Sequence, residues 1–166
     1  SLQSYLIPKT LHGRMLSLMF LLLSALVGIT WLMVSMMVSS ILEEYIGRNA
    51  LNVSKAVSLT TVVEEGLKNK NSSKIQMYAE SVRKATGARF VVVGDHEGRR
   101  YSHPVPERIG KFMVGGDNPR ALEKGEAYVS KAVGTLGPSM RGKVPIFDDA
   151  EKVIGVVSVG YLQETV

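Results

Sequence analysis

Residues 89–104, which read RFVVVGDHEGRRYSHP, decide the fold. Residues 90–93 are aromatic or β-branched, a composition typical of a strand. Residues 94–98 are glycine and polar residues that tolerate the tight backbone angles of a turn. Residues 99–103 then predict the returning strand of a hairpin, which Pro104 ends. Before residue 89 the apolar residues recur with a helical period, and from residue 89 onward the pattern changes to that of strands.

Two helices are predicted before the hairpin. Apolar residues recur at spacings of three and four between residues 42 and 63, which indicates an amphipathic helix of about 20–25 residues. Gly66 and the polar residues 68–71 end this helix. Ser72 or Ser73 can cap a second helix, which Gly87 ends.

Three further strands are predicted after the hairpin. A loop rich in proline and glycine leads to a short helix at 118–124, and strand patterns follow at 127–133, 139–147 and 153–161. Strands joined by short turns run antiparallel. The sequence therefore predicts an α+β domain with a five-stranded antiparallel sheet. The long N-terminal helix covers one face of this sheet, and the other face is free to form a pocket.

Residues 15–42 form an apolar run of 28 residues without a charge. About 20 apolar residues are enough for a helix to cross a bilayer, so this run predicts a transmembrane helix. Lys9 and Arg14 precede it, and positively charged residues stay in the cytoplasm. We therefore expect residues 1–14 in the cytoplasm, residues 15–42 in the cell membrane and residues 43–166 outside it. A cleaved signal peptide and a buried core helix are the alternatives, but the run is long for the former and lacks charge for the latter.

The composition excludes several kinds of site. The 166 residues include no cysteine, which removes disulfides, thiolate metal sites and thiol nucleophiles. No phosphate-binding glycine loop, histidine pair with metal spacing or serine-nucleophile motif is present. We expect no catalytic residue, metal or cofactor in this chain. The net charge of +5 comes without an arginine-rich helix, so we expect no nucleic-acid partner.

Arg141 and Lys143 are candidate ligand-binding residues. They lie two apart in a predicted strand, so their side chains point to the same face. Two like charges side by side repel, so the pair needs either an anion or a solvated surface. Gly142 between them leaves room for the close approach of a ligand or a backbone. Residues 134–138, GTLGP, form a loop whose N–H groups and hydroxyl suit an oxyanion.

Simpler explanations exist for these basic residues. A solvated edge strand would accommodate Arg141 and Lys143, because lysine is common at sheet edges. Arg100 and His103 would equally suit the surface of a hairpin.

Four segments together resemble a known family. RYSHP (100–104), RIG (108–110), GTLGPSMRGKVPIF (134–147) and IGVVSVGY (154–161) follow the membrane run in that order. They resemble the extracytoplasmic sensor domain of bacterial citrate and four-carbon dicarboxylate sensor histidine kinases, the CitA/DcuS family. The resemblance covers residues 10–166. It implies a PAS-like fold of the PDC or Cache type and a small carboxylate ligand, either citrate or malate, fumarate or succinate.

The resemblance also implies which residues bind the ligand. These are the four basic side chains and the loop and strand donors that match the family's positions: Arg100, His103, Thr135, Leu136, Arg141, Lys143 and Ser158. Val92 stands where a citrate sensor has a threonine, whereas Lys143 resembles the citrate sensors. Arginine binds carboxylates bidentately. We expect His103 to titrate near neutrality, so that its protonated form binds the acid better.

Finally, the resemblance implies that this chain is a fragment of a sensor histidine kinase. The chain has no ATP-binding or phospho-accepting motif, so we expect no enzymatic activity in it. Residues 153–161 lead toward a second membrane helix of the parent protein. We expect ligand binding to shift this strand and so to move that helix relative to the first membrane helix, residues 15–42. The apolar stripe of residues 42–63 suits a homodimer contact or a cover for the sheet. The alternatives are a chemoreceptor ectodomain with the same fold, an anchored binding protein and an anchored enzyme.

Overall fold

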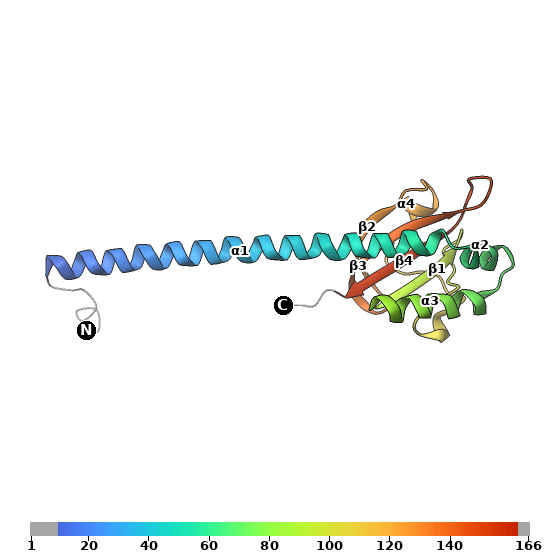
Figure 1. Ribbon diagram of the computed structural model, residues 1–166, viewed down its shortest axis with the longest axis horizontal. Helices are drawn as coiled ribbons and strands as arrows, with labels where there is room; N and C mark the ends of the chain where they lie inside the picture. Colours follow the sequence, from blue (N-terminus) through green and yellow to red (C-terminus); the bar gives the residue numbers. More distant parts are fainter. Residues whose placement is uncertain (1–9, 163–166) are drawn as a thin grey trace. The chain divides into compact units, whose positions relative to one another are not determined.

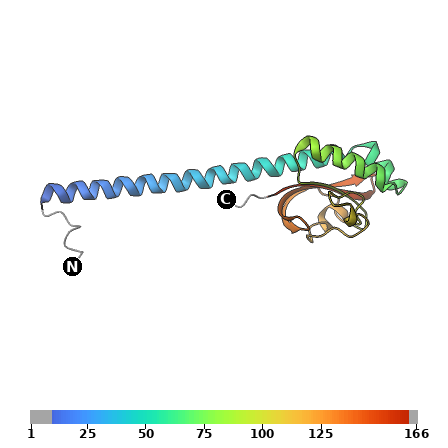
Figure 2. The same ribbon diagram turned by 90° about the horizontal axis from the view of Figure 1, so that it is seen from below.

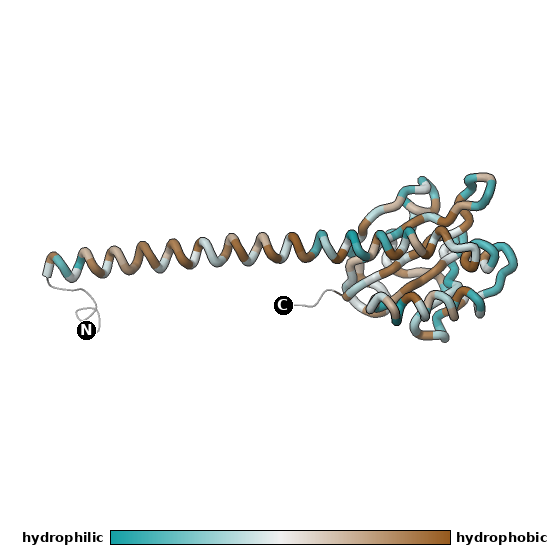
Figure 3. Tube along the Cα trace, viewed as in Figure 1, coloured by the Kyte–Doolittle hydropathy of each residue, from teal (hydrophilic) through white to brown (hydrophobic). Residues whose placement is uncertain are grey.

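The computed structural model of the chain describes residues 10–162. The chain divides into two units, Ser1–Leu42 and Glu43–Val166. Helix α1 (Leu11–Ser58) forms most of the described part of the first unit and continues into the second (Figure 1). Within residues 10–162 it is the one helix that is long and apolar enough to cross a membrane. The hydropathy colouring of Figure 3 shows this apolar stretch as mostly brown.

The second unit contains an antiparallel sheet of four strands, in the order β1-β4-β3-β2. The strands are β1 (Phe90–Asp95), β2 (Tyr128–Gly134), β3 (Gly137–Phe147) and β4 (Val153–Leu162). The α+β class, the antiparallel pairing and the three C-terminal strands are therefore confirmed. β3 and β4 lie in the interior of the sheet, while β1 and β2 form its edges.

The prediction of five strands was wrong, because residues 99–103 do not form the returning strand of a hairpin. This segment makes only isolated bridges, Gly94 with Arg100 and Arg99 with Phe112. The hydroxyl of Ser102 accepts a hydrogen bond from the Val93 N–H (2.8 Å) and donates to the Val91 carbonyl (3.1 Å). The backbone bonds the same edge, since the Tyr101 N–H donates to the Val93 carbonyl at 2.7 Å, but the contacts do not form a continuous ladder of strand pairs.

The helices of the second unit differ from prediction mainly at their ends. α1 ends at Ser58, and residues 61–68 form a separate helix, α2 (Thr61–Lys68). The break falls where Thr60 has an extended backbone (φ −80°, ψ 134°). In α3 (Ser72–Thr86) the N-cap is Asn71, whose side chain accepts from the Lys74 N–H at 3.1 Å, and the predicted serine caps were wrong. Gly87 ends α3 in the left-handed conformation, as predicted.

The helices cover one face of the sheet, and the apolar core lies beneath them (Figure 2). The core is made of buried residues from α1, α2, α3 and three of the strands, among them Val57, Val63, Ile75, Val91, Val93, Ile146, Val157 and Val159. The opposite face carries the loop of residues 96–127, with the 3-10 turn η2 (Pro106–Arg108) and the short helix α4 (Pro119–Leu122). The fold thus leaves the loop face of the sheet free for a pocket, as the sequence pattern predicted.

Helix α1 contacts the sheet at Gly142, between the two basic residues of β3. A Cβ atom at this glycine would lie 2.4 Å from the backbone of Ala50 and Leu51, so only glycine allows the helix so close. Beside this contact the Ser54 hydroxyl donates to the Gly142 carbonyl (2.7 Å) and accepts from the Val159 N–H (3.2 Å). The close approach expected at Gly142 is therefore made by a helix backbone. It lies on the face of β3 opposite to Arg141 and Lys143.

Candidate ligand-binding site

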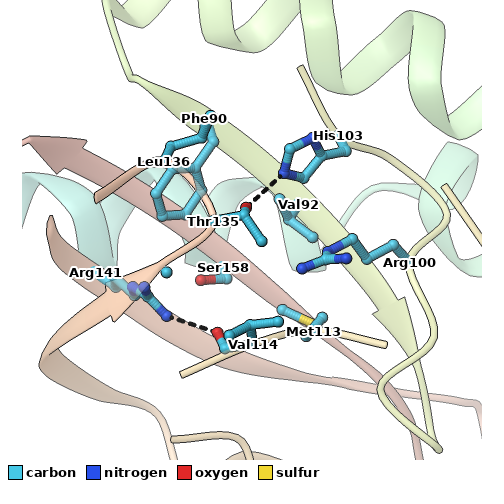
Figure 4. A pocket seen from close by; sticks show the side chains of 11 residues that line it. Phe90, Val92, Arg100, His103, Met113, Val114, Thr135, Leu136, Arg141 and Ser158 are labelled. Atoms are coloured by element: carbon cyan, nitrogen blue, oxygen red, sulfur yellow. Dashed lines mark hydrogen bonds between the residues drawn. The ribbon is translucent and has the colours of Figure 1, made fainter. Parts of the chain in front are cut away.

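A cavity lies between the sheet and the loop of residues 96–127. Six of the seven predicted site residues line it: Arg100, His103, Thr135, Leu136, Arg141 and Ser158. They come from the segment after β1, from the turn between β2 and β3, and from β3 and β4. Figure 4 shows Arg100 and Arg141 entering from opposite sides, with Ser158 between them. The fold thus brings together residues that are up to 58 positions apart in the sequence.

Arg100 is a buried cation without an acidic partner. The residue is 5% exposed and lines the cavity, and within residues 10–162 its guanidinium has neither a salt bridge nor a hydrogen bond. Burial and the neighbouring Arg108 lower the pKa of Arg100. A buried charge without a counter-ion costs free energy, and an anion bound in the cavity would remove that cost. The exposed hairpin position that the sequence allowed for Arg100 is therefore ruled out.

His103 is held by contacts on both sides of its ring. Its Nδ1 accepts a hydrogen bond from the Val105 N–H at 2.9 Å, so the proton of the neutral ring is assigned to Nε2. Nε2 lies 3.2 Å from the Thr135 hydroxyl (dashed in Figure 4). Gln76 of α3 bonds both the N–H and the carbonyl of His103 at 2.9 and 2.8 Å, which fixes the backbone.

The protonation state of His103 differs from the prediction. Burial first, and the charge of Arg100 second, lower the pKa of His103 to about 4. The ring is therefore neutral at pH 7, and the expectation that it titrates near neutrality was wrong. The sequence could not reveal this, because the charge of Arg100 acts on a ring that is only 2% exposed.

Arg141 is bonded by the protein itself. Its Nε donates to the Ser139 hydroxyl (2.9 Å), Nη1 donates to the Val114 carbonyl (3.2 Å) and Nη2 donates to the Ala132 carbonyl (3.3 Å). Nη1 also forms a salt bridge with Asp117 Oδ1 at 3.3 Å. Burial lowers the pKa of Arg141, and Asp117 opposes that shift. Most donors of this guanidinium therefore have acceptors within the chain.

Lys143 is the one predicted site residue that does not line the cavity. Its side chain is fully buried, its Nζ lies 3.2 Å from Asp117 Oδ1, and it donates to the amide oxygen of Asn118. Burial lowers the pKa of Lys143 to about 8, against the opposing effect of Asp117. Because β3 is an interior strand, a solvated edge is ruled out for both Arg141 and Lys143.

Asp117 is a site residue that the sequence reasoning missed. Its Oδ1 contacts both cations of β3, and its Oδ2 accepts from the Ser130 hydroxyl at 2.8 Å. Burial alone would raise the pKa of Asp117, but Lys143, Ser130 and Arg141 together bring it below its ordinary value. The glycine pair 115–116 before it was a signal of an unusual backbone, and both glycines have positive φ (129° and 67°).

Strand register explains the rest of the cavity wall. Val92 of β1, Ser158 of β4 and Lys143 of β3 are direct partners in one row across the sheet. The next row contains Phe90 and Arg141, whose guanidinium carbon lies 5.7 Å from the ring centre. These rows place the Ser158 hydroxyl and the apolar side chains of Val92 and Phe90 in the cavity wall next to Arg141. Among residues 10–162, no group of three acidic or histidine side chains is placed to hold a metal ion.

Residues 36–166 match the family named single cache domain 3. The chain belongs to this family, which confirms the Cache type of fold expected from the motifs.

Two relatives and one solved structure show where the similarity lies. The chain is 49% identical to the sensor protein CitS of Halalkalibacterium halodurans, over 97% of the chain and 30% of that protein. It is 38% identical to the sensor histidine kinase CitA of Klebsiella pneumoniae, over 87% of the chain and 27% of that protein. It shares 36% identity and a TM-score of 0.68 with the crystal structure of the E. coli DcuS sensor domain, covering 72% of the chain and 90% of that domain.

These similarities confirm that the chain is a sensor region of the CitA/DcuS type. The chain spans less than a third of the length of the curated relatives named here.

Proposed function

We propose that this domain binds a small di- or tricarboxylate in the cavity between Arg100 and Arg141. The observation that carries the proposal is Arg100, a largely buried residue that lines the cavity and has no acidic partner within residues 10–162. A fork of donors that points into a cavity suits a carboxylate, because its two oxygens accept two parallel hydrogen bonds. Citrate, malate, fumarate and succinate are the candidates that the family resemblance supplies.

The arrangement of donors supports two separated carboxylate groups on one ligand. One carboxylate would bind Arg100 and the Nε2–H of His103, and the other would bind at Arg141 with Thr135 on the intervening turn. The hydroxyl of Ser158 lies between the arginines and would donate to either group (Figure 4). Leu136 would contribute its backbone N–H from the same turn as Thr135.

A bound carboxylate should change the protonation of His103. A negative charge near Nε2 favours the charged ring, so it would raise the pKa of His103 from about 4. Binding would then take up protons below neutral pH, and the affinity would gain from protonation of His103. This replaces the expectation that the ring is half-charged near neutrality.

We further propose that residues 15–42 anchor the domain in the cell membrane, with the N-terminus in the cytoplasm and the sensor domain outside. The length and apolar composition of α1 support a single span. The parent protein would be a sensor histidine kinase, as the name of the Klebsiella relative states for that protein. The homodimer stays a prediction, because the buried residues of α1 after residue 42 pack toward its own sheet.

Calorimetry on the complete 166-residue chain in lipid nanodiscs tests this proposal. We expect at least one of citrate, malate, fumarate and succinate to bind with a stoichiometry of one per chain, and acetate to bind much more weakly. A protein that is folded and binds none of these acids would contradict the proposed function.

A further inference from the structure

One carboxylate of the protein already contacts the cations of β3. Asp117 Oδ1 lies 3.3 Å from Nη1 of Arg141 and 3.2 Å from Nζ of Lys143. The other oxygen, Oδ2, accepts from the hydroxyl of Ser130 at 2.8 Å. Two cations and a hydroxyl are the kind of partners that a carboxylate needs, and one of these cations, Arg141, lines the cavity.

The loop that carries Asp117 is closely fitted to Arg141. The carbonyl of Val114 accepts from Arg141 Nη1 at 3.2 Å, and a Cβ atom on Gly115 would lie 2.5 Å from the same nitrogen. Gly115 has a φ of 129°, which L side chains rarely adopt. The backbone therefore passes over the guanidinium and delivers the Asp117 carboxylate to it. Met113 and Val114 of the same loop line the cavity.

The Asp117 side chain is the acid that neutralises this side of the site. It is the one acidic group in the described chain that forms a salt bridge with Arg141 or Lys143. Arg100, on the other side of the cavity, has no such partner. A ligand carboxylate at Arg100 gains a new ion pair, whereas a ligand carboxylate at Arg141 has to replace one that exists.

We propose that Asp117 is an internal competitor of the ligand, which holds the guanidinium of Arg141 until a ligand carboxylate displaces it from there. This inference rests on the proposed function and deepens it. On the β3 side, ligand binding is an exchange of one carboxylate for another. Asp117 therefore lowers the affinity for carboxylates, and it does so most for ligands that carry the most negative charge.

The decisive experiment compares the complete chain with its Asp117→Asn variant by calorimetry at pH 6.0 in nanodiscs, with succinate and citrate as ligands. Asparagine keeps the size of the side chain and removes its charge. The variant lacks the acid that raises the pKa of Lys143, so a pH below the value of about 8 that Lys143 has beside Asp117 is chosen to favour its protonated form. We expect Asp117→Asn to bind succinate about tenfold more tightly, and citrate with a larger gain. Unchanged or weaker binding by the folded variant would overturn the proposal.

A matched control separates the local effect from the change in net charge. Asp149→Asn alters the net charge by the same amount, but the side chain of Asp149 is 94% exposed and lies outside the cavity. We expect this variant to bind both acids within twofold of the wild type. A gain in Asp149→Asn equal to that in Asp117→Asn would show a general charge effect and would also overturn the proposal.

A second variant decides the question if Asp117→Asn does not fold. Ser130→Ala removes the hydroxyl that fixes Asp117 Oδ2 and leaves the charge in place, so it should loosen the internal carboxylate and tighten ligand binding about threefold. Unchanged or weaker binding by Ser130→Ala would then overturn the proposal.

The proposed function fails by a different result. If the wild type and Asp149→Asn bind none of the acids, the domain is not a carboxylate sensor. If both bind while neither Asp117→Asn nor Ser130→Ala binds more tightly, only the role of Asp117 is lost.

Discussion

The two cationic sides of the cavity are built in opposite ways. Arg100 is buried without an acidic partner in the described chain, and the neighbouring His103 is neutral. Arg141 and Lys143 are equally buried but share the carboxylate of Asp117. A buried arginine thus acts differently on the two sides of the cavity. A cation without a partner contributes binding energy when an anion arrives, whereas a paired cation must first lose its partner, and removal of one member of such a pair destabilises the fold.

The difference arises from what each segment brings close to its arginine. Two acids precede Arg100 in the turn: Glu97 is exposed, and Asp95 accepts hydrogen bonds from the N–H groups of Glu97 and Arg99. Asp95 is therefore committed to the turn. On the other side, the loop before α4 folds over β3 and carries Asp117 directly to Arg141.

The largest effect is expected from Arg100→Ala. Removal of the Arg100 guanidinium deletes two charge-assisted hydrogen bonds to the ligand, each worth about 1.5–3 kcal/mol, so the affinity should fall more than 100-fold. The free energy of unfolding should stay the same or rise, because a buried charge without a partner is removed. Calorimetry and urea unfolding measure the two quantities. Arg89→Ala, an exposed arginine just before β1, is the control and should change neither.

Arg141→Ala should lower the free energy of unfolding, in contrast to Arg100→Ala. Breaking a buried ion pair costs about 3–5 kcal/mol, so the free energy of unfolding should fall by about that amount. Urea unfolding followed by circular dichroism tests it, and Arg141→Lys should retain part of the stability because it keeps the charge. A wild-type free energy of unfolding in Arg141→Ala would contradict the contrast between the two arginines.

The pH dependence of stability tests the environment of His103. Its pKa is about 4 in the fold against an ordinary value of 6.5, so the folded protein binds fewer protons than the unfolded chain between these values. Stability from this group is present above pH 6.5 and is lost as the pH falls toward 4. Between pH 7 and 4.5 the loss should be about 2 kcal/mol. His103→Gln should lack this contribution, and equal pH profiles of the two proteins would contradict it.

The smallest effect is expected behind the site, at Ser54. Ser54→Ala removes two buried hydrogen bonds to β3 and β4, which should lower the free energy of unfolding by about 1–2 kcal/mol. Ligand affinity should stay within twofold, because Ser54 lies on the helix face of the sheet. Ser81→Ala removes an exposed serine hydroxyl of α3 and serves as the control. A tenfold loss of affinity in Ser54→Ala would show that this contact positions the cavity residues.

The sequence predicted the elements of the fold better than their ends. The β-forming residues 90–93, the turn after them and the three C-terminal strands follow from local composition. The fifth strand failed because Ser102 bonds the edge of β1 with its hydroxyl, a choice that depends on tertiary contacts. The break at Thr60 likewise has no signal in the periodicity of the helix that precedes it.

The candidate site was predictable where chemistry is carried by motifs. Six of the seven residues transferred from the family resemblance line one cavity. The position of Lys143 outside the cavity wall and the role of Asp117 were not predictable, because both depend on how a long loop folds over a strand 24 residues further on. The low pKa of His103 was missed for the same reason, since burial is a property of the folded chain.

A crystal structure of the chain with citrate, malate or succinate bound tests the central claim most directly. The account predicts one carboxylate within hydrogen-bond distance of the Arg100 guanidinium and a second one at Arg141, with Asp117 turned away from that arginine. A ligand bound outside this cavity, or one that leaves Arg100 without an anionic partner, would contradict it.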